Sequence, residues 1–258
     1  MLIGIPKEVK NHEYRVGLTP TAVREAVHHG HEVLVETGAG AAIGLMDEDY
    51  RAAGADIAEN GAAVFAKAGM IVKVKEPQPA EIAMLREGQV LFTYLHLAPD
   101  PDQTKGLMAS GATAIAYETV TDNFGGLPLL APMSEVAGRM SIQAGAHCLE
   151  MEQGGRGALL GGVAGVPAAD VLILGGGVVG SNAARIAIGS EARVTVIDLN
   201  LRRLKELDDQ FSSSLNTIYS TVDTIEKHVI NSALVIGAVL VPGAAAPRLV
   251  TEDMVKGM

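Results

Sequence analysis

The chain has 258 residues, of which 48% are hydrophobic and 30 are glycines, so it is long enough for two domains and typical of an α/β protein with many short turns. The net charge of -10 and the absence of a basic cluster argue against a nucleic-acid partner, since neutralising phosphates requires concentrated Lys and Arg, and the single cysteine excludes an intrachain disulfide. No apolar stretch reaches the roughly 20 residues that cross a bilayer and no signal peptide is readable, so we expect a soluble, cytoplasmic protein without a membrane partner.

The first half of the chain alternates short apolar runs with helical patterns. The apolar runs predict strands at residues 2–5, 32–36, 70–74, 90–94 and 113–117. Helices are predicted from Thr19-Pro20, a typical N-cap and first-turn proline, to about residue 30, and at 47–53, 61–67, 80–86 and 102–110. Strands that alternate with helices predict a parallel sheet with helices on both faces.

Polar side chains follow several of these strands, at the edge where α/β proteins place their ligands. Lys75 follows one strand and could supply positive charge to a carbonyl or carboxylate oxygen. His96 follows the next strand and could act as a general acid or base, because histidine is the side chain that titrates near neutral pH. Arg15 has a rigid fork that suits a carboxylate. Each also fits a plainer interpretation, a hydrogen-bonded or solvated surface residue, and no cluster of His, Cys and acidic residues has the spacing of metal ligands.

Residues 132–152 form a long helical pattern, and a glycine-rich segment follows it up to Pro167. We interpret residues 132–169 as the connection between a substrate domain at 1–131 and a dinucleotide domain at 170–258. Cys148 lies on the apolar helix and is predicted to be buried packing rather than a nucleophile. The apolar face of this helix could pack against a second subunit or be buried within its own.

The most informative segment is a glycine-rich turn between a predicted strand and a predicted helix. The apolar run at 171–174 stops at Gly175, and Gly177 and Gly180 complete the pattern G-x-G-x-x-G before the helical pattern. A second apolar run ends at Asp198, at the distance of about 20 residues that is typical of dinucleotide-binding domains. The first glycine allows a tight turn, the second lets the backbone approach a pyrophosphate, and the third lets helix and strand pack closely. The helix N-terminus offers N–H groups to the phosphates. The alternative is a glycine-rich turn in an ordinary α/β domain.

Asp198 also bears on the choice of cofactor. Its carboxylate can accept hydrogen bonds from ribose hydroxyls and would repel a 2′-phosphate, which predicts NAD rather than NADP. Arg202 and Arg203 lie close in sequence and weaken this argument slightly.

Strands after residue 170 are predicted at 171–175, 193–198, 216–219 and 233–237, about four where a complete dinucleotide fold has six. Either the chain is truncated or the second half of this fold is abbreviated, and truncation is favoured. We therefore expect an α/β fold of two Rossmann-like domains, with parallel sheets covered by helices on both faces and a truncated C-terminal part.

The motifs together resemble those of bacterial alanine dehydrogenases, in the alanine dehydrogenase/pyridine nucleotide transhydrogenase family. The resemblance covers essentially the whole chain. The matching segments are IGIPKE at 3–8 with Arg15-Val16, VLVETGAG at 33–40, IVKVKEP at 71–77, LFTYLHLA at 91–98, IAYETV at 115–120, LPLLAPMSEVAGRM at 127–140, LGGV at 160–163, the glycine turn, and VIGAVLVPGAAAPRLVTEDMV at 235–255. The transhydrogenase α-subunit shares the fold and the Arg15-Val16 start but is less similar at 127–140.

The resemblance implies reversible, NAD-dependent oxidation of L-alanine to pyruvate and ammonium. In the matching positions, Arg15 binds the substrate carboxylate, Lys75 contacts its carboxylate or carbonyl oxygen, His96 is the acid/base residue, and Tyr94 lines the pocket. The positions that match cofactor contacts, besides the glycines, are Ser134, Val178, Asp198, Arg203, Ser220, Val239 and Leu240.

The family also implies a hexamer, and its members continue past the position of Met258 with a segment that carries a catalytic Asp. A second interpretation is therefore a catalytically incomplete, transhydrogenase-like dinucleotide-binding subunit, which would bind NADH without turning over alanine. A third is a structural α/β protein, which would have no dinucleotide affinity.

Overall fold

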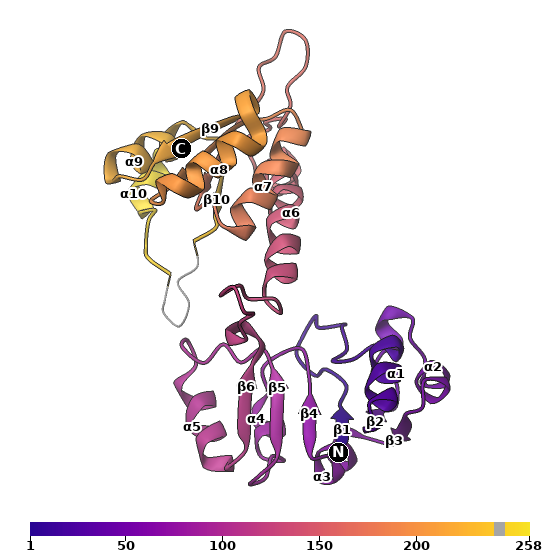
Figure 1. Cartoon of the computed structure of the whole chain (residues 1–258). Coiled ribbons are helices and arrows are strands. Elements are labelled where there is room, and N and C mark those ends of the chain that lie inside the picture. Colours follow the sequence, from indigo (N-terminus) through magenta and orange to yellow (C-terminus); the bar gives the residue numbers. More distant parts are fainter. Residues whose placement is uncertain (240–245) are drawn as a thin grey trace. The chain divides into compact units, whose positions relative to one another are not determined.

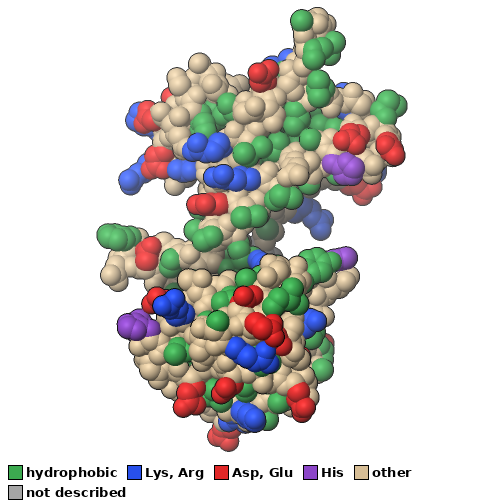
Figure 2. Space-filling view, turned by 90° about the vertical axis from the view of Figure 1, so that its right-hand side faces the viewer, with side chains coloured by type: hydrophobic (Ala, Val, Ile, Leu, Met, Phe, Trp, Pro, Cys, Tyr) green, Lys and Arg blue, Asp and Glu red, His purple; other side chains and the backbone are tan. Residues whose placement is uncertain are grey.

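The computed structural model describes residues 1–239 and 246–258, and it divides into two compact units, Met1–Leu127 and Pro128–Met258 (Figure 1). Both units are parallel sheets with helices on both faces, which confirms the predicted fold class. Among the described helices, none has both the length and the apolar character needed to cross a membrane. On the face that Figure 2 shows, Lys and Arg side chains lie interspersed with Asp and Glu in both units.

The first unit is built on six parallel strands in the order β3-β2-β1-β4-β5-β6. The strands are β1 Leu2–Ile5, β2 Glu32–Glu36, β3 Asp56–Ala58, β4 Met70–Val72, β5 Val90–Thr93 and β6 Thr113–Ala116. The helices are α1 Pro20–His28, α2 Asp47–Ala52, α3 Gly61–Lys67, α4 Pro79–Ile82 and α5 Pro101–Ser110, with short 3-10 turns η1 Ala41–Ile43 and η2 Tyr117–Thr119.

Alternating side chains on the strands of this unit separate two apolar layers. Val33 and Val35 of β2 pack on one face with α1 and α2, whereas Leu34 packs on the other face with α3 and α5. Each layer is closed by aliphatic side chains and a single large aromatic, Tyr50 on the first face and Phe65 on the second. The sheet is therefore held from both sides, and the ends of its strands are fixed in place.

The second unit has four described parallel strands in the order β10-β7-β8-β9. They are β7 Asp170–Leu174, β8 Arg193–Asp198, β9 Leu215–Tyr219 and β10 Leu234–Gly237. The helices are α6 Ala131–Cys148, α7 Val178–Gly189, α8 Leu201–Phe211, α9 Val222–Asn231 and α10 Glu252–Lys256, with 3-10 turns η3 Met151–Gln153 and η4 Ser212–Ser214. Two apolar layers again cover the sheet, one with α6, α7 and α8 and the other with α9 and α10.

The structure places α6, which the sequence suggested as a connection, inside the second unit. A Cβ added at Gly138 would lie 2.2 Å from the carbonyl oxygen of Val179, so α6 and α7 are in close backbone contact. Ile142 and Leu149 continue this buried stripe. Cys148 lies beside the stripe and is exposed, so its predicted burial is wrong. Apolar side chains such as Val136 and Met140 also lie on exposed parts of this helix, and the sequence therefore does not indicate which face is covered.

Candidate functional site

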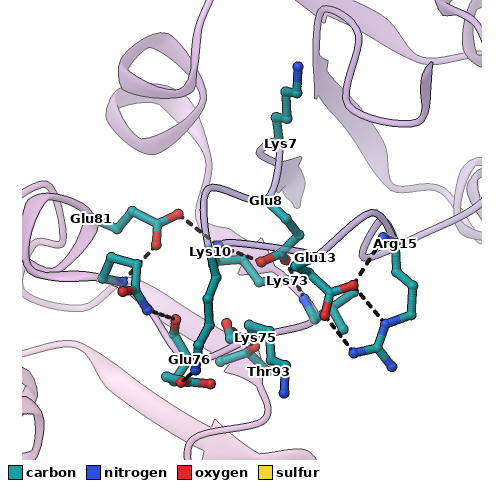
Figure 3. A network of polar contacts seen from close by, with 12 residues as sticks. Lys7, Glu8, Lys10, Glu13, Arg15, Lys73, Lys75, Glu76, Glu81 and Thr93 are labelled. Atoms are coloured by element: carbon teal, nitrogen blue, oxygen red, sulfur yellow. Dashed lines mark hydrogen bonds and ion pairs between the residues drawn. The ribbon is translucent and has the colours of Figure 1, made fainter. Parts of the chain in front are cut away.

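The first candidate site lies at the carboxyl edge of the sheet in the first unit. The strand order reverses between β1 and β4, and open parallel sheets bind ligands at such a switch point. The segments that follow β1, β4 and β5 carry Arg15, Lys75 and His96, so the topology brings these predicted residues to one edge. Figure 3 shows the polar network around Arg15 and Lys75.

A buried ion cluster ties the first two of these segments together. Lys73, directly after β4, is 1% exposed and lies 3.2 Å from Glu8 Oε2 and 2.7 Å from Glu81 Oε1 (Figure 3). Glu8 Oε1 also accepts a hydrogen bond from the backbone N–H of Val74 at 2.7 Å. Burial raises the pKa of Glu8 above its usual value, against the opposing attraction of Lys73. The cluster fixes the loops after β1 and β4 against α4, and sequence analysis assigned it no role.

Arg15 is held by a neighbouring carboxylate. Glu13 accepts hydrogen bonds from the backbone N–H of Arg15 at 3.0 Å, from its Nε at 2.8 Å and from its Nη2 at 2.6 Å. This side-chain hydrogen bonding lowers the pKa of Glu13 and raises that of Arg15. The Arg15 side chain is 46% exposed although its orientation is set. The arrangement gives a guanidinium of fixed direction at the switch point, suited to a carboxylate ligand.

Lys75 and Glu76 continue the segment after β4. Thr93 at the end of β5 donates its hydroxyl to the Lys75 carbonyl oxygen at 2.8 Å, which fixes the backbone that carries the lysine. Glu76 forms an ion pair with Lys10 (Figure 3). Burial opposes ionisation of Glu76, but the hydrogen bond from Lys10 and other contacts leave its pKa lowered. Its second oxygen, Oε2, is buried without a hydrogen-bond partner among the described residues.

Tyr94 and His96 lie at the end of β5, their rings nearly parallel and 6.2 Å apart. Tyr94 is 6% exposed, packs edge-on against Tyr117 at 4.9 Å, and burial raises its pKa. His96 is exposed and has a φ of +49°, a left-handed conformation that is uncommon outside glycine. Glu118, for which no role was predicted, accepts hydrogen bonds from the backbone N–H groups of Leu95 and His96 at this turn.

The second candidate site lies at the switch point of the other sheet, between β7 and β10, where the glycine turn follows β7. Gly175 has a φ of +101°, and a Cβ there would lie 2.8 Å from the carbonyl oxygen of Ala238. A Cβ at Gly180 would lie 1.8 Å from the carbonyl oxygen of Gly175, so helix and turn pack without room for a side chain. A Cβ at Gly177 would meet nothing within 4 Å, so the turn is open on that side. Gly177 is the N-cap of α7, and no side chain caps the first N–H groups there.

Asp198 ends β8 beside the glycine turn. Its carboxylate accepts hydrogen bonds from the backbone N–H of Gly176 at 2.6 Å and of Asn200 at 2.7 Å. Arg203 Nε donates to the Gly176 carbonyl oxygen at 2.6 Å, and its Nη1 pairs with Glu206 at 2.9 Å. An open pocket of about 450 Å³ lies here, lined by Gly177, Asp198, Asn200, Arg202, Arg203 and Glu206.

The remaining predicted cofactor residues are distributed around this edge. Val178 is the first residue of α7, and Ser220 and Val239 follow β9 and β10 at the same carboxyl edge of the sheet. Ser134 lies on α6, one turn before the close contact at Gly138. Leu240 lies outside the described residues. Among the residues that the structure describes, no group of three His, Cys, Asp or Glu side chains could hold a metal ion.

The chain matches two family models that together cover nearly all of it. "Alanine dehydrogenase/PNT, N-terminal domain" matches residues 4–137, and "Alanine dehydrogenase/PNT, C-terminal domain" matches residues 141–258. Among curated proteins, the chain is 57% identical to the alanine dehydrogenase of Halomonas elongata and 54% identical to that of Bacillus subtilis. Both alignments cover all of this chain, and they cover 70% and 68% of those proteins.

Among solved structures, an alanine dehydrogenase is more similar to the chain than a transhydrogenase is. An L-alanine dehydrogenase matches with a TM-score of 0.91 and 51% identity, over all of this chain and 71% of the other. The transhydrogenase of Sinorhizobium meliloti matches with a TM-score of 0.82 and 26% identity, over all of this chain and 75% of the other. The resemblance found in the sequence motifs is thereby confirmed.

Proposed function

The chain belongs to the alanine dehydrogenase/PNT family, and we propose that it is an alanine dehydrogenase that uses NAD to interconvert L-alanine with pyruvate and ammonium. The observation that carries this assignment is the 57% sequence identity to an alanine dehydrogenase in an alignment that covers the whole chain. The transhydrogenase alternative has less support, because identity to that structure is 26%. The chain is thus an oxidoreductase, and the cofactor and residue roles below belong to the proposal.

Arg15 and Lys75 bind the substrate in this proposal. Both are cations at the switch point, and both substrates, alanine and pyruvate, carry a carboxylate. Glu13 fixes the Arg15 guanidinium, and Thr93 fixes the backbone of Lys75. The two cations would hold the carboxylate so that the substrate Cα keeps one orientation, which accelerates a reaction by positioning. Tyr94 would close the side of the pocket next to His96.

His96 is the acid/base residue. Removing hydride from the alanine Cα leaves an iminium, to which water must add to form a carbinolamine. His96 would take the proton from that water and help the carbinolamine collapse to pyruvate and ammonium. In the reverse direction the same group would protonate the leaving hydroxyl.

The second unit fits a dinucleotide. NAD, when bound, supplies the hydride acceptor. The turn at Gly177 has open space where a pyrophosphate would approach, and the α7 N-terminus presents N–H groups without a side-chain cap. Asp198 would face the ribose hydroxyls from the end of β8, and its charge favours NAD over NADP. The other cofactor contacts in the proposal are Ser134, Val178, Arg203, Ser220, Val239 and Leu240.

The test is NADH oxidation, followed by absorbance, with pyruvate and ammonium. We expect turnover that requires both substrates. His96→Ala should lower kcat by about a hundredfold or more, which is the rate enhancement that general acid–base catalysis typically supplies. The Kd for NADH should stay within about twofold of that of the unchanged protein, because His96 has no proposed role in dinucleotide binding. His28→Ala, which changes an exposed histidine on α1, is the matched control and should retain turnover.

Two results would contradict the proposal. NADH binding by the unchanged protein without turnover would favour a dinucleotide-binding subunit. Equal loss of turnover and NADH binding in the His96 variant would remove that residue from acid/base chemistry. The cytoplasmic location and the hexamer remain proposals, and light scattering of the purified protein measures the second.

A further inference from the structure

The backbone at His96 is held in an uncommon conformation. Its φ of +49° lies in the left-handed region, where a side chain crowds the following carbonyl oxygen. Gly and, less often, Asn adopt this conformation with little strain. Non-glycine residues in this region persist only where their surroundings impose it, and they cluster at functional sites. A histidine here therefore needs a physical cause in the surrounding contacts.

Glu118 supplies the first part of that cause. It follows β6 in η2, and β6 pairs in parallel with β5 so that Ala116 lies opposite Thr93. The two oxygens of Glu118 accept hydrogen bonds from the Leu95 N–H at 3.1 and 3.2 Å, and Oε1 also accepts one from the His96 N–H at 2.7 Å. Hydrogen bonds to an ionised carboxylate are about twice as strong as those between neutral groups.

Gln103 on α5 supplies the second part. Its Nε2 donates to the Leu95 carbonyl oxygen at 2.6 Å, and the residue is only 7% exposed. The peptide plane between Leu95 and His96 is therefore held at both ends, at its carbonyl oxygen by Gln103 and at its N–H by Glu118. The angle φ of His96 describes rotation about its N–Cα bond relative to this peptide plane, and contacts from α5 and η2 fix the plane.

We infer that Glu118 is a positioning residue for His96, and that its carboxylate keeps the imidazole in the orientation the reaction needs. This rests on the proposed acid/base role of His96. Without the carboxylate, the Leu95 and His96 N–H groups lose their acceptor, and φ at His96 can relax to the commoner negative values. The imidazole would then turn away from the Tyr94 ring, while the residues that bind substrate carboxylate and dinucleotide stay in place.

The test is a double-mutant cycle on the protein in the NADH assay. Glu118→Gln keeps the shape of the side chain but offers one acceptor oxygen in place of two. We expect it to lower kcat by about tenfold or more, with KM for pyruvate within about threefold and the Kd for NADH within about twofold. In a His96→Ala background the same change should have less than about a twofold effect, because residues that act through one another are not additive. Glu59→Gln, an exposed carboxylate change in the same unit, is the matched control.

The outcomes separate this inference from the function on which it rests. A His96→Ala protein that retains turnover would refute the acid/base assignment and the inference with it. Loss of turnover in His96→Ala but not in Glu118→Gln would overturn the inference alone, as would an equal loss from Glu118→Gln in both backgrounds.

Discussion

Replacing Lys73 by methionine tests how much the buried ion cluster of Lys73, Glu8 and Glu81 stabilises the first unit. Methionine matches the length and apolar stem of lysine but removes the charge. Side-chain exposure is 1% for Lys73, 2% for Glu8 and 5% for Glu81, so water cannot replace the lost ammonium. Removing one partner of a buried ion pair costs roughly 3–5 kcal/mol. Glu8 and Glu81 each keep one backbone hydrogen bond, from Val74 and Gln78, so we expect a loss of about 4 kcal/mol near neutral pH.

The loss should depend on pH in a defined direction. The pKa of Glu8 is already raised by burial in the intact cluster. A carboxyl whose folded pKa exceeds its unfolded value of about 4.3 stabilises the fold below that value, and the contribution disappears as pH rises through the folded pKa. Removing Lys73 raises the folded pKa further. The variant should therefore lose at least about 1 kcal/mol less stability, relative to the unchanged protein, at pH 5 than at pH 8.

Urea unfolding followed by tyrosine fluorescence measures this effect, because four of the five tyrosines (14, 50, 94 and 117) lie in the first unit and the protein has no tryptophan. Lys105→Met changes an exposed lysine that lies 3.6 Å from Asp102, and it should cost less than about 0.5 kcal/mol. Adding Glu8→Gln and Glu81→Gln to the Lys73 variant should recover part of the loss, since no charge then remains buried. A loss below about 1 kcal/mol at pH 8, with no dependence on pH, would refute the reasoning.

Two further predictions concern the dinucleotide site. Gly180→Ala should lower NADH affinity by about tenfold or more and also lower the melting temperature, because its Cβ would lie 1.8 Å from the carbonyl oxygen of Gly175. Gly189→Ala is the control and should keep both values, because a Cβ there would meet nothing within 4 Å. Similar behaviour of the two variants would contradict the packing argument. Asp198→Asn and Glu206→Gln each remove a negative charge from the pocket beside Arg203, so each should lower the ratio of the NADPH and NADH Kd values by about threefold or more in fluorescence titrations. Unchanged ratios in both variants would show that these carboxylates do not set the choice of dinucleotide.

Most of the fold could be predicted because parallel strands buried on both faces appear in the sequence as short apolar runs between turns. The strands at 2–5, 32–36 and 193–198 have the predicted bounds, and the four strands after residue 170 are all present. The missed strand, β3 Asp56–Ala58, has only three residues and too little pattern to detect. The helix predicted at 80–86 is the single turn Pro79–Ile82, in which Glu81 is buried against Lys73.

The candidate site was only partly predictable from sequence. Residues at strand ends could be found, because parallel strands place their carboxyl ends at one edge. Lys73 and Lys75 are two residues apart in one motif, however, and the sequence does not say which is buried. Glu8 lies 65 residues from Lys73, and Glu118 lies 22 residues from His96, so both partnerships depend on neighbouring strands that only the tertiary structure aligns.

Burial separates the structural cations of the first unit from those that can meet a ligand. Lys73 is enclosed by two carboxylates and is 1% exposed, so its charge stabilises the two loops after β1 and β4 and cannot contact a ligand. Arg15 is also paired with a carboxylate, but its side chain is 46% exposed. An incoming carboxylate can approach the second cation and not the first. At the glycine turn of the other unit, the open side of Gly177 and the N-terminus of α7 offer backbone N–H groups to a phosphate, beside Arg203. The two sheets thus have switch points of the same topology, and the proposed function assigns a small carboxylate to the exposed side-chain charge of the first and a dinucleotide to the backbone N–H groups of the second.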